Sequence, residues 1–270
     1  MTHFNVVIPA RYGATRLPGK PLRLLAGKPL VQHVFERAME SGAGEVVIAT
    51  DDDRIRAAAE KFGARVCMTS PRHRSGTERL SEVASLLNYP ADNIIVNLQG
   101  DEPLLPPSLI RQVAEDLAAH PAASIATLSA PLTQAAQLFD PNVVKLVMDH
   151  MGFALYFSRA PIPWNRDNFG QDSAHLDIHA DYFRHVGLYA YRCGFLREYV
   201  DRPPCRLEQL ESLEQLRALW YGYRIHVAHA LVEPVAGVDT EEDLLRLEAV
   251  LRDHGAKDTI VPTAHGESQN

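Results

Sequence analysis

The sequence has few cysteines, no long apolar run and no excess of positive charge, and each shortage excludes a class of protein. Its three cysteines, Cys67, Cys193 and Cys205, are odd in number and widely separated, which indicates reduced thiols without metal-site spacing. No apolar run approaches the roughly 20 residues that span a bilayer, and the N-terminus shows no signal-peptide pattern. The net charge of −7 argues against a general nucleic-acid binder. We therefore expect a cytoplasmic protein that binds neither membranes nor nucleic acid.

The chain does contain enough apolar residues for a large folded domain, with 46% hydrophobic residues among 270. Short runs rich in β-branched residues alternate with amphipathic stretches through the first half. The predicted strands are 4–9, 45–50, 64–69, 93–99 and 124–130, and the predicted helices lie near 29–41, 52–62, 76–88 and 107–120. This alternation indicates an α/β protein with βαβ units, a mainly parallel sheet and helices on both sides of it.

The pattern changes after Pro131, where strands follow one another with few helices between them. Strands are predicted at 143–149, 153–159, 185–192 and 224–231, and helices at 207–221 and from Asp239 to about His254. This region should form an antiparallel or mixed part of the structure. Because no stretch is long and polar enough to act as a linker, we expect one domain over residues 1–255 and a flexible tail over 256–270.

A loop rich in cations follows the first predicted strand. The strand sequence FNVVI is followed by PARYGATRLPGKPL, which contains two arginines, a lysine and two glycines. In open α/β sheets ligands bind at the carboxyl ends of the strands, because connecting loops and helix N-termini converge there. Cations on a glycine-containing loop at that edge suit a polyphosphate, and the alternative is a solvated basic loop.

The stretch HRSGTERL places Ser75, Gly76 and Thr77 directly before a predicted helix. Backbone amides at such a position either receive a phosphate or ribose, or are satisfied by an ordinary N-cap side chain. From the local pattern alone both interpretations remain open.

Two acidic stretches also follow predicted strands. NLQGDEPLLPP presents Gln99, Asp101 and Glu102 around a glycine, and GVDTEEDL presents Asp239. A carboxylate beside a polyphosphate would repel it unless a divalent cation lay between them, and Mg²⁺ is usually held by one or two carboxylates plus substrate oxygens. Asp239 has an alternative role, because Asp-Thr-Glu-Glu at a helix start is also an N-cap with acidic first-turn residues.

Seven motifs together resemble the 3-deoxy-manno-octulosonate (KDO) cytidylyltransferases, the CMP-KDO synthetases of Gram-negative bacteria. They occur in the order PARYGATRLPGKPL, SGTERL, NLQGDEP, YFSRAPIPW, RHVGLYAYR, LEQLESLEQLRALWYG and GVDTEEDL. The resemblance extends from about residue 4 to 252. It implies a nucleotide-diphospho-sugar transferase fold, a homodimer, dependence on Mg²⁺, and transfer of CMP from CTP to KDO with release of pyrophosphate, a step of lipopolysaccharide biosynthesis.

The resemblance also implies which residues of the first half, 1–130, bind the nucleotide. Arg11, Arg16 and Lys20 match the cations that bind the triphosphate, and the backbone of Pro9 and Ala10 matches positions near the cytosine. The positions that match cytidine contacts are Arg74, Ser75 and Gln99. Asp101 and Asp239 match a metal-binding pair, so that Arg11, Lys20, Asp101 and Asp239 form the expected catalytic set.

The second half, 131–255, is expected to bind the sugar and to contribute to the dimer contact. KDO carries one carboxylate and many hydroxyls, so its site needs a fixed cation and several hydrogen-bonding side chains. The matching residues are Arg159, His185, Tyr189, Glu211, Glu214 and Gln215, with Arg159 as the expected carboxylate partner and 211–215 expected on one helix. The leucine stripe 207, 210, 213 and 216 favours a core or dimer contact. Trp164 and Trp220 are expected to be packing residues.

The expected reaction is in-line attack of the anomeric hydroxyl of the sugar on the α-phosphorus of CTP. Metal held by Asp101 and Asp239 would lower the pKa of that hydroxyl and align the attack, so a dedicated side-chain base is not required. Two alternatives remain open from the sequence. One is a cytidylyltransferase for another acidic sugar, such as a sialic acid or 8-amino-KDO, and the other is a non-catalytic nucleotide-binding regulator.

Overall fold

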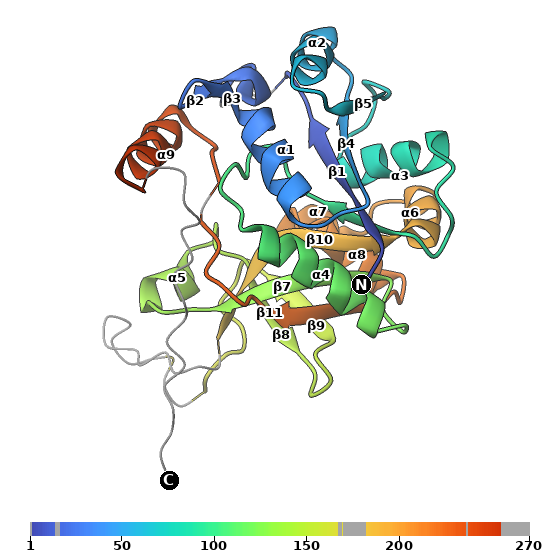
Figure 1. The fold of residues 1–270 in the computed structure, drawn as a ribbon. Coiled ribbons are helices and arrows are strands. Elements are labelled where there is room, and N and C mark those ends of the chain that lie inside the picture. Colours follow the sequence, from blue (N-terminus) through green and yellow to red (C-terminus); the bar gives the residue numbers. More distant parts are fainter. Residues whose placement is uncertain (1, 14–16, 167–168, 170–181, 236, 255–270) are drawn as a thin grey trace.

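The computed structural model describes residues 2–13, 17–166, 169, 182–235 and 237–254 (Figure 1). Arg16 and the tail 256–270 lie outside the described residues. Within the described part of the chain, no helix is both long and apolar enough to cross a bilayer.

A nine-stranded sheet runs through the described structure. Its main path has the strand order β11-β7-β10-β6-β1-β4-β5, and β8 and β9 extend it at the side of β10. The strands are β1 (Phe4–Ala10), β4 (Glu45–Thr50), β5 (Arg65–Met68), β6 (Ile94–Asn97), β7 (Ile125–Pro131), β8 (Lys145–Met148), β9 (Ala154–Ser158), β10 (Phe183–Arg192) and β11 (Ile225–His229).

The sheet is mixed, as the sequence predicts. Strands β6, β1, β4 and β5 pair in parallel, and β11 pairs in parallel with β7. Strand β10 runs antiparallel between β6 and β7, and the β8–β9 pair is also antiparallel. The antiparallel region is therefore built onto the parallel sheet through β10, which lies inside it.

Helices cover both faces of this sheet. Helices α1 (Leu30–Glu40) and α4 (Pro107–Ala119) pack on one face, in front of the sheet in Figure 1, and α3 (Gly76–Leu86) and α6 (Cys193–Val200) pack on the other. Alternate side chains of β1 enter the two cores: Val6 and Ile8 join the first, and Val7 joins the second. Burial on both faces is why this strand is continuously apolar in sequence. The mainly parallel, mixed sheet flanked by helices that the sequence predicts is confirmed.

The C-terminal helix α9 (Glu241–His254) packs beside a small hairpin formed by β2 (Leu24–Leu25) and β3 (Lys28–Pro29). A separate apolar cluster joins Leu25 and Leu30 to Val238, Leu244 and Leu247. This cluster holds the last helix near the loop that follows β1. The sequence patterns predict neither this hairpin nor the short helices η1 (Lys20–Leu22) and α5 (Ala135–Phe139). Helix α2 (Asp53–Lys61) agrees with the helix predicted near 52–62.

The predicted single helix over 207–221 is wrong, because two short helices occupy this region. Helix α7 (Arg206–Glu211) ends where Ser212 adopts a left-handed backbone with φ 51°, and α8 (Gln215–Trp220) starts after it. The expected leucine stripe is broken as well, since Leu210 is 66% exposed while Leu216 is buried.

The two tryptophans also differ from expectation. Trp164 and Trp220 are 63% and 57% exposed, so neither lies in the core, although Trp164 meets the ring of Phe169 edge-on.

Candidate active site

The loops that follow β1 and β6 lie side by side, because these two strands pair in parallel with Val7 opposite Asn97. Together with the start of α3 they enclose a cavity of about 250 Å³. Six residues predicted from the sequence to bind nucleotide line it: Pro9, Ala10, Arg11, Lys20, Gln99 and Asp101. Tertiary structure thus brings the cation-rich loop and the acidic loop to one edge of the sheet.

A glycine permits this close approach of the two loops. A Cβ atom at Gly100 would lie 3.0 Å from the carbonyl oxygen of Pro9, which is closer than nearly all real contacts of that kind. A side chain there would push the acidic loop away from the end of β1. The glycine in NLQGDEP is therefore needed for the walls of the cavity.

Lys20 lies between the two acidic residues that the sequence predicts as a pair. Its Nζ donates to Asp101 Oδ2 at 2.7 Å and to Asp239 Oδ1 at 2.9 Å. Burial by itself lowers the pKa of Lys20, but the two carboxylates outweigh that effect and raise it. Along the chain, Asp101 lies 81 residues from Lys20 and Asp239 lies 219 residues from it.

The position of Asp239 is set by its neighbours. The amide of Val238 donates to the carbonyl oxygen of Asp101 at 2.9 Å, and a Cβ at Gly237 would lie only 2.7 Å from the same oxygen. Thr240 caps α9, because its Oγ1 accepts from the amide of Asp243 at 3.2 Å. Asp239 therefore directs its carboxylate to Lys20 while the next residue takes the capping role.

The convergence of two carboxylates on one ammonium fits a site for a hard divalent cation. Carboxylate oxygens are the ligands that Mg²⁺ prefers, and Lys20 already occupies the position of positive charge between them. A third acid, Glu102, lies beside this group. Burial, with a further contribution from the charge of Asp101, raises the pKa of Glu102 to about 8.

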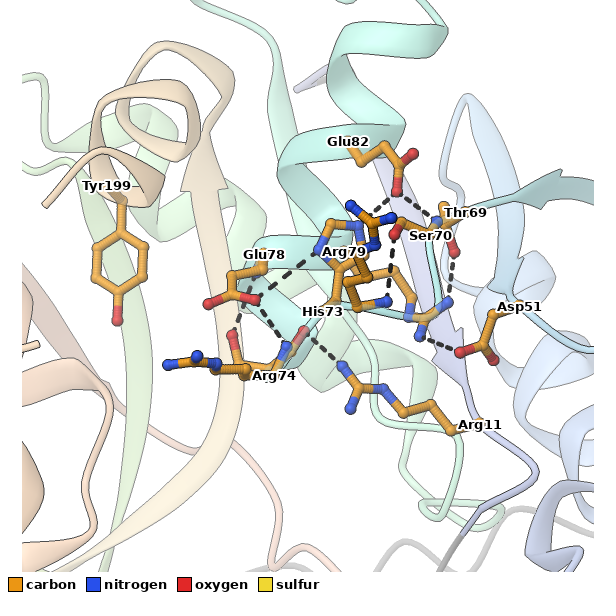
Figure 2. A network of polar contacts seen from close by, with 12 residues as sticks. Arg11, Asp51, Thr69, Ser70, His73, Arg74, Glu78, Arg79, Glu82 and Tyr199 are labelled. Atoms are coloured by element: carbon orange, nitrogen blue, oxygen red, sulfur yellow. Dashed lines mark hydrogen bonds and ion pairs between the residues drawn. The ribbon is translucent and has the colours of Figure 1, made fainter. Parts of the chain in front are cut away.

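The loop before α3 is tied to both halves of the site (Figure 2). Arg11 donates from NH2 to the carbonyl oxygen of Ser75 at 3.2 Å. The Ser75 hydroxyl is the N-cap of α3, accepting from the amide of Glu78 at 3.2 Å, and it donates to Glu214 at 2.7 Å. The N-cap interpretation of Ser75 is thus correct. Burial, with the nearby charge of Arg79 next, lowers the pKa of Arg11.

Arg79 is a supporting residue that the sequence patterns did not single out. Its side chain is fully buried and donates to Thr69 Oγ1 and, at 3.1 Å, to Asp51 Oδ2, as Figure 2 shows. The sequence signal that could have identified Arg79 is its place in SGTERL, directly before the apolar Leu80 of the predicted helix. A buried arginine needs polar partners, and here they join α3 to the segments that follow β4 and β5.

Arg74 does not line the 250 Å³ cavity that most of the predicted nucleotide residues share. In Figure 2 its side chain points away from Arg11, and with Ser75 it lines a second cavity of about 550 Å³.

Four of the six residues predicted to bind sugar are divided between two further cavities. One, of about 470 Å³, is lined by Gln99, Glu102 and His185 among others. The other, of about 150 Å³, is lined by Tyr189, Glu214 and Gln215 among others. Gln99 also lines the 250 Å³ cavity, so it connects the predicted nucleotide and sugar residues.

The polar groups of Gln215 and His185 differ in their surroundings. The Nε2 atom of Gln215 is buried and has no hydrogen-bond partner among the described residues. An unpaired buried donor is costly, so this amide is suited to a hydroxyl or carboxylate that enters the cavity. His185 Nε2 lies 2.9 Å from Thr127 Oγ1, and burial lowers the pKa of His185 to about 3, which keeps the imidazole neutral.

Arg159 and Glu211 line neither of these two cavities and instead join β9 to α7. The Arg159 guanidinium donates to the carbonyl oxygens of Glu211 at 2.6 Å, Pro141 at 2.7 Å and Ser212 at 3.5 Å. Glu211 accepts from the Arg159 amide at 2.9 Å. The expected clustering of residues 211–215 on one helix is wrong, because Glu211 ends α7 and Gln215 begins α8.

Comparisons with known proteins agree with this geometry. The family model described as cytidylyltransferase matches residues 5–225. A curated 3-deoxy-manno-octulosonate cytidylyltransferase of Idiomarina loihiensis is 57% identical over 250 residues, covering 93% of this chain and 99% of that protein. The protein of the same name from Vibrio parahaemolyticus is 58% identical over 249 residues, covering 92% and 98%.

A solved structure gives the same result in three dimensions. It is described as CMP:2-keto-3-deoxy-manno-octonic acid synthetase complexed with CTP, and it matches with a TM-score of 0.84 and 42% identity. The match covers 93% of this chain and 99% of that one. With identity this high over nearly the whole length, the chain belongs to the cytidylyltransferase family, within the group of 3-deoxy-manno-octulosonate cytidylyltransferases.

Proposed function

We propose that this protein transfers a cytidylyl group from CTP to KDO, giving CMP-KDO and pyrophosphate for lipopolysaccharide synthesis. The observation that carries the proposal is the convergence of Lys20, Asp101 and Asp239 beside the 250 Å³ cavity. Cations for a triphosphate and carboxylates for a metal meet there at one edge of an α/β sheet. The solved relative bound to CTP, at 42% identity, supports the same ligand for this chain.

The nucleotide residues divide into two roles. Arg11 and Lys20 bind the triphosphate, and Lys20 stabilises the negative charge that grows on pyrophosphate as the α–β bond breaks. Pro9, Ala10 and Gln99 border the same cavity and orient the base and ribose. Arg74 and Ser75, which line the 550 Å³ cavity, stay predicted cytidine contacts. Arg16 stays a predicted triphosphate ligand outside the described residues.

Asp101 and Asp239 would hold Mg²⁺, since both present carboxylate oxygens to one positive charge. When bound, Mg²⁺ would balance phosphate charge and lower the pKa of the attacking hydroxyl. The protein itself aligns the reactants, because the acidic loop and α9 are anchored to each other through Val238 and Asp101.

The sugar is proposed to occupy the cavities around β10. Gln215 supplies an unpaired amide donor, Tyr189 and Glu214 supply further hydrogen-bonding groups, and the neutral ring of His185 lines the larger cavity. Arg159 stays the predicted carboxylate partner. Its three bonds to backbone carbonyls hold it beside Glu211, and the role of Glu211 is then to position the arginine.

We also propose a single domain, a homodimer and a cytoplasmic location for the whole protein. One continuous sheet from β1 to β11 supports a single domain with a nucleotide half and a sugar half. Exposed apolar side chains on adjacent elements of the second half, Leu155, Leu210 and Trp220, support a homodimer. A cytoplasmic location remains the expectation from the sequence.

The direct test is pyrophosphate release from CTP with KDO and Mg²⁺, with identification of CMP-KDO by mass spectrometry. Asp101→Asn is the matched control, because it keeps the shape of the side chain and removes its charge. Turnover with a sialic acid or 8-amino-KDO, but not with KDO, would show that the substrate is another acidic sugar. CTP binding without pyrophosphate release from any of these acids would favour a non-catalytic regulator.

A further inference from the structure

Three side chains with metal-binding chemistry meet away from the nucleotide cavity. Asp116 and His120 lie one turn apart near the end of α4, and His226 lies near the start of β11 opposite Ala126 of β7. Helix α4 begins just after the acidic loop and runs back along the sheet, beside β7 and β11 (Figure 1). Its last turn therefore reaches the sheet edge opposite the candidate active site.

The potential ligand atoms are close together and mostly shielded from water. Nδ1 of His226 lies 2.7 Å from Asp116 Oδ2, and Nδ1 of His120 lies 3.4 Å from Asp116 Oδ1. One ligand atom from each of the three residues can be chosen so that all lie within 4.8 Å of one another. The side chains of Asp116 and His226 are 10% and 8% exposed, whereas that of His120 is 35% exposed.

The partners of His226 require a positive species beside it. Its Nε2 lies 3.1 Å from the carbonyl oxygen of Met151, and since a carbonyl only accepts, Nε2 carries a hydrogen. In a neutral ring Nδ1 would then direct a lone pair at the Asp116 carboxylate. Either a second proton or a metal ion must lie between them. Donation of the other ring N–H to a backbone carbonyl is the usual arrangement of a metal-binding histidine.

The surrounding residues hold the His226 ring in this orientation. Gly152 has φ +80°, and a Cβ there would lie 2.7 Å from His226 Nε2, so only glycine lets this turn place the Met151 carbonyl against the ring. The ring of Phe153 meets both imidazoles edge-on, at 85° to each. The imidazoles themselves stack with centroids 3.4 Å apart.

We propose that Asp116, His120 and His226 form a binding site for a first-row divalent cation such as Zn²⁺. Two imidazole nitrogens and one carboxylate suit Zn²⁺ or Co²⁺, whereas Mg²⁺ prefers oxygen ligands throughout. A tetrahedral ion with bonds of about 2.1 Å needs ligand atoms about 3.4 Å apart. The 2.7 Å between His226 Nδ1 and Asp116 Oδ2 is shorter than this spacing, so binding adjusts the positions of the ligand atoms, and water completes the coordination.

His120 is the residue that moves on binding. It is the most exposed of the three, it stands at the C-cap of α4, and its Nδ1 gives up a 2.8 Å bond to the carbonyl oxygen of Asp116. The bound ion then links α4 to β11. Because the site is assembled only in the folded chain, the ion stabilises the protein against unfolding.

The test is a Co²⁺ titration of the full chain carrying Asp101→Asn, which weakens metal binding at the candidate active site. We expect one equivalent of Co²⁺ with the visible absorption of a four-coordinate ion, and we expect Zn²⁺ to raise the melting temperature. Adding His120→Gln or Asp116→Asn should weaken binding at least tenfold, roughly the lower limit for loss of a ligand contact. His150→Gln is the matched control, since it removes an exposed histidine next to Met151.

Circular dichroism of the metal-free variants distinguishes lost binding from lost structure. His120→Gln is the variant that should disturb the fold least, because the His120 side chain is the most exposed of the three. Equal Co²⁺ affinity and equal Zn²⁺ stabilisation in the parent, His120→Gln and His150→Gln proteins would overturn the proposal. So would the absence of any stoichiometric binding.

Discussion

At the scale of single residues, Lys20 explains how two carboxylates from distant parts of the chain come close together. Its ammonium bonds to both, and its side chain is only 12% exposed. A bound metal would take the place of this ammonium between Asp101 and Asp239, which would leave Lys20 available to the triphosphate. The site is thus electrostatically prepared for positive charge, which reduces the reorganisation needed when substrates bind.

The carboxylates themselves give the first prediction. Asp101→Asn and Asp239→Asn should each lower kcat at least about a hundredfold, the scale for loss of one preorganised electrostatic group. The measurement is steady-state pyrophosphate release at saturating Mg²⁺. Glu241→Gln is the control, because this exposed acid at the start of α9 pairs with Arg23 and not with Lys20. Near-normal turnover in either aspartate variant would contradict the metal-pair assignment.

His185 gives a prediction about stability against pH. Its pKa is about 3 in the folded protein, against about 6.5 in the unfolded chain. Between these values only the unfolded chain binds the proton, so the free energy of unfolding falls as pH drops below 6.5, by up to about 1.4 kcal/mol per pH unit. Above pH 7 both states are neutral and the contribution vanishes.

Urea unfolding at pH 4.5 and pH 7 measures this effect. His185→Gln should lose less stability between the two pH values than the parent protein, whatever its stability at pH 7. His150→Gln should behave like the parent because its side chain is exposed. An unchanged difference in His185→Gln would mean that the folded protein protonates this histidine normally.

At the scale of elements, the break between α7 and α8 separates residues that the sequence places on one helix. Ser212 has φ 51°, a conformation that costs an L-residue with a side chain about 1 kcal/mol or more. The break lets Arg159 reach the carbonyls of Glu211 and Ser212 while Gln215 faces the other side, into the 150 Å³ cavity. The strained residue therefore separates two sets of candidate sugar residues.

Ser212→Gly should stabilise the protein, because glycine adopts this backbone without the steric cost. The gain should not exceed about 1 kcal/mol, since glycine also gains freedom in the unfolded chain. Ser85→Gly, inside α3, is the control and should destabilise by about 0.5 kcal/mol. Chemical denaturation of both variants makes the comparison. A Ser212→Gly protein less stable than Ser85→Gly would show that the left-handed residue carries no strain.

At the scale of the whole molecule, the exposed apolar residues point to an assembly larger than one chain. Leu155 on β9, Leu210 on α7 and Trp220 on α8 are each more than half exposed, and α8 packs against both α7 and β9. Large apolar side chains on adjacent elements are typical of a surface covered by another protein.

The prediction at this scale is that the chain sediments at twice its mass of 30.0 kDa. Leu155→Glu should shift it toward the monomer, because a carboxylate in an apolar contact must be desolvated without a partner. Leu24→Glu, at an exposed apolar position on β2, should leave the mass unchanged. Sedimentation equilibrium measures both. A wild-type monomer at micromolar concentration would contradict the homodimer.

The sequence alone determined the features that depend on neighbours along the chain. Apolar runs and amphipathic periods predicted the strands and helices of the parallel half, because these patterns repeat every two to four residues. Glycines and cations indicated the loops at the strand ends. The motif order indicated the family. Local patterns left the roles of Ser75 and Asp239 open, because each could be a helix cap or part of a ligand site.

Tertiary structure decided the contacts between distant segments. Asp239 reaches Lys20 because Val238, Leu244 and Leu247 join an apolar cluster with Leu25 and Leu30, and no local pattern encodes that packing. In the same way, the burial of Arg79 and the left-handed turn at Ser212 depend on what surrounds them. Local propensity sets which elements form, whereas the close packing of side chains from remote parts of the chain sets which functional groups meet.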